Sequence, residues 1–208
     1  MVAIAEPRPK TQKSFAELHG VDKTLVFNTW QGLLAASAET ISTVGKRLAD
    51  AVLIAVQDYL HAEVAVAFAA QGYHILCEKP MATDIQDCIK MENAIKNKGI
   101  VFGMGHGMYI QRFSLHGTLS SLLCLVMRYS PYSREITEIV RSGSLGELIN
   151  ITQIEPVGFY HFAHSYVRGN WSNEKSSSFA LMTKCCQYVL CSYIYFRFHF
   201  FTLLLQRH

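Results

Sequence analysis

Short apolar runs alternate with longer mixed segments along the first half of the chain. The runs have the length and composition of β-strands, and the mixed segments place apolar residues on one face of a helix. Because strands and helices follow one another in turn, the sequence predicts parallel βαβ units in a doubly wound α/β sheet. Strands are predicted at residues 2–5, 24–27, 51–56, 73–77 and 100–103, and helices at 11–19, 33–48, 61–70 and 83–98.

The run at residues 51–56, Ala-Val-Leu-Ile-Ala-Val, is apolar at every position. A strand with one solvated face alternates apolar and polar residues, whereas a strand covered on both faces is continuously apolar. We therefore expect this strand to be buried on both faces of the sheet.

Local signals mark where the predicted helices begin and end. Gly20, Gly72 and Gly99 stand where three of the helices are expected to stop. Thr83 and Gln86 have the spacing of a capping box at the start of the last helix. Four apolar residues are expected on the inner side of that helix: Ile85, Cys88, Ile89 and Ile95.

The pattern changes after residue 106. Residues 107–125 show neither the helix nor the strand period, and a second α+β domain is predicted to start after them. Residues 133–141 read as a helix, and residues 147–155 alternate as in a sheet with one solvated face. We expect an incomplete Rossmann-like domain at 1–106, an insertion at 107–126, a hinge and the start of the second domain at 127–186, and an aberrant apolar tail at 187–208.

The tail is almost continuously apolar and aromatic over residues 188–205, close to the shortest length that spans a membrane. Arg197 and His199 lie near its middle, where a charge is costly in a bilayer. We expect a buried or aggregation-prone terminus rather than a membrane span.

Composition narrows the class of protein. Of 208 residues, 50% are hydrophobic and 17% charged, as in a chain with a packed core. The net charge of +3 is small and the basic residues are scattered, so no nucleic-acid partner is expected. The six cysteines form no CxxC pair and no zinc-type spacing, so we expect no metal site and reduced thiols. The N-terminus does not have the pattern of a signal peptide, and we expect a cytoplasmic protein.

Polar residues follow several of the predicted strands. In an open parallel sheet, ligands bind beyond the carboxyl ends of the strands, so these side chains are expected to meet in one crevice. They are Glu6 and Arg8 after the first strand, then Gln57, Asp58, Tyr59 and His61, then Glu78, Lys79 and Pro80, and finally Gly103, Gly105 and His106.

Two of these groups suggest dinucleotide chemistry. Glu6 can accept hydrogen bonds from the ribose hydroxyls of an adenosine, or it is a solvated loop carboxylate. Arg8 can instead meet a 2′-phosphate, so NAD and NADP stay alternatives. The Lys79 ammonium can donate a hydrogen bond to a carbinol or carbonyl oxygen during hydride transfer, with Glu78 orienting it and Pro80 fixing the backbone. The alternative for Lys79 is an exposed lysine ahead of a helix.

A longer stretch, residues 49–88, resembles the glucose–fructose oxidoreductase / inositol dehydrogenase / rhizopine-catabolism (GFO/IDH/MOCA) family. The buried strand, His61, the Gly72 turn and Glu78-Lys79-Pro80 come in the order and spacing of that family. Apart from the insertion at 107–126, the likeness extends over about residues 2–186. Further matching segments are Gly105-His106, Arg128-Tyr129-Ser130-Pro131 and Gly143-Ser144-Leu145-Gly146-Glu147.

The resemblance implies a Rossmann domain followed by a mostly β substrate domain, with NAD(P)-linked oxidation or reduction of a sugar, polyol or related hydroxyl compound. It implies that Lys79 is catalytic, that the peptide before Pro80 is cis, that the substrate is a small carbohydrate-like molecule and that intact relatives are homo-oligomers. Together with the strand-end argument, it leads us to expect the NAD or NADP site at Glu6, Arg8, Gln57, His61, Glu78, Lys79, Pro80, His106 and Arg128.

The sequence also departs from the family. It contains no GxGxxG loop, and Met1 opens at what resembles the second strand, so we expect a sheet that lacks its first strand. The family's Asp and His, four residues apart, align with Thr183 and Gln187. We therefore expect a truncated, catalytically impaired form, or alternatively a non-catalytic form that acts by protein binding at an exposed sheet edge or with a membrane-associated tail.

Overall fold

The computed structural model describes residues 1–96, 98–105, 131–149, 157–169, 171–173 and 177–178. The chain divides into two compact units, Met1–Met104 and Gly105–His208. The finer limits expected for the insertion, the second domain and the tail stay predictions.

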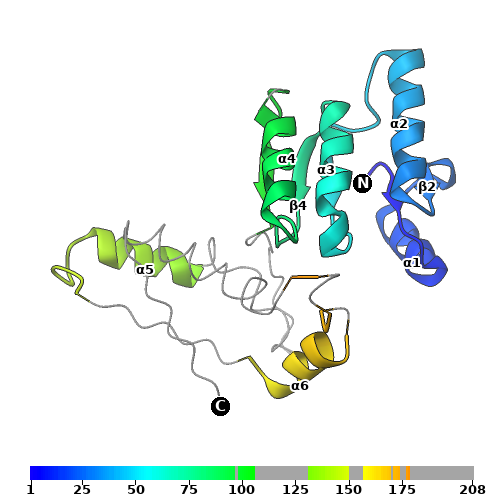
Figure 1. The fold of residues 1–208 in the computed structure, drawn as a ribbon. Coiled ribbons are helices and arrows are strands. Elements are labelled where there is room, and N and C mark those ends of the chain that lie inside the picture. Colours follow the sequence, from blue (N-terminus) through cyan, green and yellow to red (C-terminus); the bar gives the residue numbers. More distant parts are fainter. Residues whose placement is uncertain (97, 106–130, 150–156, 170, 174–176, 179–208) are drawn as a thin grey trace. The chain divides into compact units, whose positions relative to one another are not determined.

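Strands and helices alternate in the first unit, and every strand pair in it is parallel (Figure 1). The predicted α/β class with a Rossmann-like parallel arrangement is therefore confirmed. The strands form two sheets, in the orders β1-β2 and β3-β4-β5. Their bounds are β1 Ile4–Ala5, β2 Val26–Phe27, β3 Ala51–Ile54, β4 His74–Cys77 and β5 Phe102–Met104, and those of the helices are α1 Pro9–His19, α2 Trp30–Val44, α3 His61–Ala70 and α4 Ile85–Lys96. Two short 3₁₀ helices complete the unit, η1 at Lys23–Leu25 and η2 at Asp58–Leu60.

The core lies around α3, which contacts β3, β4, α4 and α2 (Figure 1). Five apolar residues of this helix are buried because it has neighbours on several sides: Ala62, Val64, Ala65, Phe68 and Ala69. They pack with Ile54, Ile75 and Cys77 of the sheet and with Met91 of α4. This single core fixes the β3-β4-β5 sheet and its helices.

Helix α2 links the two sheets, since it contacts β1 and β2 as well as α3. The Ser37 hydroxyl, fully buried, donates to Gln71 Oε1 at 2.7 Å and shares a hydrogen bond of 2.6 Å with the Tyr73 hydroxyl. The helix was predicted to extend to residue 48 but ends before Gly45, whose left-handed backbone (φ 72°) returns its N–H to the Ile41 carbonyl.

The prediction that the strand at 51–56 is buried on both faces is wrong, because among the described residues only one face of it is covered. Ile54 is 2% exposed on the side that packs in the core, whereas Leu53 is 62% exposed and Ala51 is also exposed. The apolar run shows that the strand belongs to a core, but it does not show whether a second layer covers the other face.

The start and the inner face of α4 also differ from expectation. Asp84, rather than Thr83, caps the helix by accepting the Asp87 N–H at 2.9 Å. Met91 is fully buried, while Ile85 and Ile89 are 73% and 44% exposed. Cys88 and Ile95 pack on the core as predicted, so the buried face is turned toward Met91.

In the second unit, α5 spans Pro131–Arg141, as predicted from residue 133 onward. Two further helical segments were not predicted, α6 at Phe159–Phe162 and the π-helical turn η4 at Ala163–Val167, because their aromatic residues are weak helix formers. The insertion, the tail and most of the alternating segment at 147–155 lie outside the described residues. Within the described ranges, no helix has the length and hydropathy needed to cross a membrane.

Candidate functional site

The candidate site lies at the carboxyl ends of β3, β4 and β5. These parallel strands are in register there, with Ile54 opposite Cys77 and Cys77 opposite Met104. The Glu78 N–H extends the pairing by one step and donates to the Ile54 carbonyl at 2.9 Å. The chain segments that follow the strands therefore leave the sheet at one common edge, as the sequence predicted.

Glu78, Lys79 and Pro80 form the centre of this edge. Cys77 before them is fully buried, Glu78 and Lys79 are half-buried, and Pro80 is buried. The Lys79–Pro80 peptide is cis, which confirms the expectation drawn from the resemblance. The roles expected of the Glu78 and Lys79 side chains stay predictions.

His61 connects the segments after β3 and β4. Its ring is 1% exposed, with Nδ1 at 2.7 Å from the Pro80 carbonyl oxygen and Nε2 at 3.1 Å from the Val56 carbonyl oxygen. Sequence reasoning placed His61 in the cofactor site but missed these bonds, because spacing along a chain does not show which backbone groups a ring will meet.

The remaining residues after β3 form η2. Gln57 precedes this turn and is exposed, and its carbonyl accepts the Leu60 N–H at 2.8 Å. Asp58 is only 7% exposed, whereas Tyr59 is 49% exposed. Gln57, His61 and the segment 78–80 thus lie at the same edge of the sheet. Asp58 is a buried carboxylate at this edge.

Glu6 and Arg8 lie at the end of β1, in the other sheet. Arg8 donates to the Glu6 carboxylate from Nε and Nη2, both at 2.8 Å, and from its backbone N–H at 2.9 Å. These bonds hold the pKa of Glu6 below its ordinary value, chiefly through the hydrogen bond from the Arg8 side chain. The two other residues expected at the cofactor, His106 and Arg128, lie outside the described residues.

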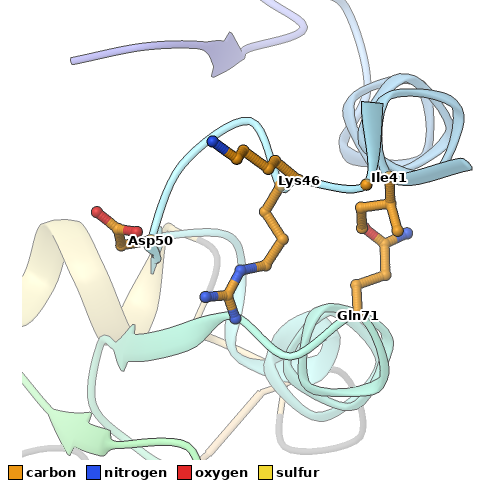
Figure 2. A pocket seen from close by; sticks show the side chains of 6 residues that line it. Ile41, Lys46, Asp50 and Gln71 are labelled. Carbon is orange, nitrogen blue, oxygen red and sulfur yellow. The ribbon is translucent and has the colours of Figure 1, made fainter. Parts of the chain in front are cut away.

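A separate polar pocket lies at the opposite end of β3. It has a volume of about 470 Å³, and Figure 2 shows Gln71 pointing toward Ile41 along one side of it. Asp50, which immediately precedes β3, places the pocket at the amino end of the strand. Ligands of open parallel sheets bind at the carboxyl ends, so this pocket is not the predicted crevice. It is lined by Ile41, Gly45, Lys46, Arg47, Asp50 and Gln71.

No group of His, Cys, Asp and Glu side chains with a geometry suited to a metal ion occurs among the described residues. The polar side chains that follow the strands at this edge are the amine of Lys79 and the carboxylates of Glu78 and Asp58.

Comparison with known proteins finds several relatives, and two of them show the identity and coverage of the match. The chain is 33% identical over 87 residues to 2,7-anhydro-N-acetylneuraminate hydratase of Escherichia coli, a match of 38% of this chain and 23% of that protein. It is 46% identical over 52 residues to scyllo-inositol 2-dehydrogenase (NADP(+)) of Bacillus subtilis, a match of 25% of this chain and 16% of that protein. The matched part is therefore less than a quarter of either relative.

Solved structures show the same fold. A dehydrogenase from Bordetella pertussis, in complex with NADH and UDP-GlcNAcA, superposes with a TM-score of 0.63 at 20% identity, over 94% of this chain and 50% of that one. An inositol dehydrogenase homologue from Azotobacter vinelandii, complexed with NAD⁺, superposes with a TM-score of 0.53 at 19% identity, over 71% of this chain and 32% of that one.

The sequence model of one family, described as an oxidoreductase family with an NAD-binding Rossmann fold, matches residues 1–106. This match covers the two parallel sheets and all the strand ends described above. The chain therefore belongs to the GFO/IDH/MocA oxidoreductase family.

Proposed function

We propose that the intact form of this protein transfers a hydride between NAD(P) and a sugar, polyol or related hydroxyl compound. The observation that carries the proposal is the position of Glu78-Lys79-Pro80 at the carboxyl end of β4, level with the ends of β3 and β5. In this role the Lys79 ammonium contacts the nicotinamide end and the reacting oxygen of the substrate, and Glu78 orients it.

The cofactor-binding residues proposed are those assigned by the resemblance. Gln57, Glu78, Lys79 and Pro80 share the strand-end edge, while Glu6 and Arg8 would receive the adenosine ribose at the end of β1. When bound, NAD(P) supplies the hydride acceptor or donor, and the protein residues orient it and hold a proton donor near the substrate.

We further propose that these 208 residues alone are catalytically impaired. The chain contains no GxGxxG loop, and such a loop holds the dinucleotide pyrophosphate on backbone N–H groups at a helix N-terminus. Without that contact, the remaining strand-end residues hold only the nucleoside parts of the cofactor. A cytoplasmic location and a homo-oligomeric intact form belong to the same proposal.

A fusion protein tests the proposal. A strand, glycine-rich turn and helix taken from an intact relative would be joined ahead of Met1, and NADH binding followed by the nicotinamide fluorescence. We expect binding in the micromolar range. The control is the same fusion with the glycines of the turn replaced by valine, which blocks the approach of the pyrophosphate. A folded fusion that does not bind NADH would contradict the proposed crevice.

One observation favours a second candidate function, binding of another protein at a sheet edge. β3 is the end strand of the order β3-β4-β5, so among the described strands it pairs with β4 alone, and its Leu53 side chain is 62% exposed. An exposed strand can pair with a strand of a partner. Light scattering of the chain mixed with an intact relative tests this idea, because a complex that disappears on Leu53→Lys would support it and two unmixed species would contradict it.

A further inference from the structure

We propose that His61 is a positioning residue that holds the Lys79-bearing turn against the end of β3. It would act through a hydrogen bond to the Pro80 carbonyl, with its other ring nitrogen beside the Val56 carbonyl, rather than by touching the cofactor. The inference rests on the proposed function only in so far as Lys79 is taken to be catalytic.

The ring is well placed for this task. His61 is the first residue of α3, whose next turns are buried in the core through Ala62, Val64 and Ala65. Its Nδ1 lies 2.7 Å from the Pro80 carbonyl oxygen and its Nε2 lies 3.1 Å from the Val56 carbonyl oxygen. One side chain anchored in the core thus joins the segment after β3 to the turn after β4.

Both ring nitrogens are taken by backbone carbonyl oxygens, and the ring is 1% exposed. Buried carbonyl groups need hydrogen-bond donors, and the ring can supply one. A neutral imidazole carries one N–H, and a proton on both nitrogens is needed to donate to both carbonyls at once. The proposal assigns the single N–H to Nδ1, which makes the shorter of the two contacts and would donate to the Pro80 carbonyl.

Lys79 lies between two fixed backbone points. On one side, the Glu78 N–H donates to the Ile54 carbonyl at 2.9 Å. On the other, the Pro80 carbonyl accepts from His61 at 2.7 Å. Only the Lys79 residue itself separates these anchors, so its Cα position is set from both sides, and loss of the His61 bond would release one of them.

Two conservative variants separate the two hydrogen bonds. In His61→Asn, the amide nitrogen takes the place of Nδ1 and can still donate to Pro80. In His61→Gln, the amide nitrogen takes the place of Nε2 and can donate to Val56 but not to Pro80. Only His61→Asn can donate to the Pro80 carbonyl, so the two variants differ in whether this anchor of the Lys79 turn is kept.

The readout is the rate of reductive methylation of Lys79 in the full chain, measured by mass spectrometry relative to the exposed Lys46. Lys79 is half-buried, so freeing its turn should raise its accessibility. We expect His61→Gln to raise the relative rate roughly three- to tenfold, as for the loss of one hydrogen bond. We expect His61→Asn to leave the rate near that of the chain that keeps His61. Equal rates in the two variants would overturn the proposal.

A destabilised core variant controls for general loosening. Tyr73→Phe removes a buried hydrogen bond to Ser37, away from the turn, and should not change the Lys79 rate. If it raises the rate as much as His61→Gln does, the positioning role is wrong. This assay needs neither cofactor nor turnover, so its outcome is independent of the proposed oxidoreductase activity.

A measurement on the unmodified chain covers the case in which the variants do not fold. Long-range ¹H–¹⁵N correlation of the His61 ring should show a proton on Nδ1. A ring protonated on Nε2 alone could not donate to the Pro80 carbonyl, and that result would overturn the proposal.

Discussion

Arg8 binds the Glu6 carboxylate through both of its oxygens, with Nε and Nη2 each donating at 2.8 Å. The pair closes a short turn directly after β1, and the Arg8 backbone N–H adds a third bond to the same carboxylate. The Glu6 side chain is 16% exposed and that of Arg8 is 73% exposed. The acceptor oxygens proposed for the ribose hydroxyls are thus occupied by a cation that faces solvent.

Removing the guanidinium should change how Glu6 titrates. Because the Arg8 side chain lowers the pKa of Glu6, the pair stabilises the fold above the ordinary pKa of 4.5, and this contribution is lost as pH falls through the lowered pKa. Arg8→Met should return the Glu6 pKa toward its ordinary value, as followed by ¹³C NMR of the carboxyl group.

The matched control is Lys13→Met, which removes only an exposed pair with Glu17 at 3.9 Å. We expect no change in the Glu6 titration from this control. A Glu6 curve unaffected by Arg8→Met would contradict the assigned cause of the shift.

The same pair bears on the choice of cofactor. In the fusion protein, Arg8→Ala should weaken NADPH binding by about tenfold relative to NADH, because a 2′-phosphate loses a charged hydrogen-bond donor. Parallel fluorescence titrations with both cofactors measure this ratio. If the two affinities fall together, Arg8 has no contact with the 2′-phosphate.

The thiol of Cys77 should be inert in the folded chain. It is fully buried, and this burial raises its pKa to about 12. We expect iodoacetamide at pH 8 to modify Cys88 before Cys77, since Cys88 is only partly buried, and to modify Cys77 at an ordinary rate in urea. Mass spectrometry of a time course gives both rates, and equal native rates would speak against the burial.

Burial of this thiol also predicts a loss of stability in alkali. The unfolded chain ionises Cys77 from about its ordinary pKa of 9.0, while the folded chain keeps the thiol neutral up to a pKa of about 12. The free energy of unfolding should therefore fall as pH rises between these values. Cys77→Ala should show a shallower fall when urea unfolding is compared across this pH range.

The Tyr73 hydroxyl, on the residue that precedes β4, links this strand to α2. It contacts the Ser37 hydroxyl at 2.6 Å and accepts the Leu48 N–H at 3.2 Å. Tyr73→Phe removes both hydrogen bonds and leaves the Leu48 N–H without this acceptor, while Ser37 keeps its bond to Gln71, so the free energy of unfolding should fall by about 1–3 kcal/mol. Urea denaturation tests this, with Tyr59→Phe, a change at a 49% exposed side chain, as a control without effect.

The sequence was a good guide to the elements and to the edge where the carboxyl ends of β3, β4 and β5 meet. Apolar runs located the strands, Gly20 and Gly72 marked helix ends, and parallel pairing followed from the alternation of elements. These features depend on local composition and on backbone conformation, which a sequence reports directly.

Features that depend on neighbours could not be predicted in this way. The exposed Leu53 and the fully buried Met91 show that the burial of an apolar residue depends on whether another layer covers it. The link from His61 to Pro80 spans 19 positions and uses a backbone carbonyl, which has no signature in the sequence. The pocket beside Asp50 likewise arises only where α2, β3 and the end of α3 meet.

The most direct test of the central claim is a titration of NADH and NADPH into the purified, unmodified chain, followed by isothermal calorimetry. The proposal is that the strand-end crevice is present but that these residues lack the glycine-rich contact for the pyrophosphate. It predicts that neither cofactor saturates the chain in the micromolar range. Saturable micromolar binding of either cofactor would contradict it.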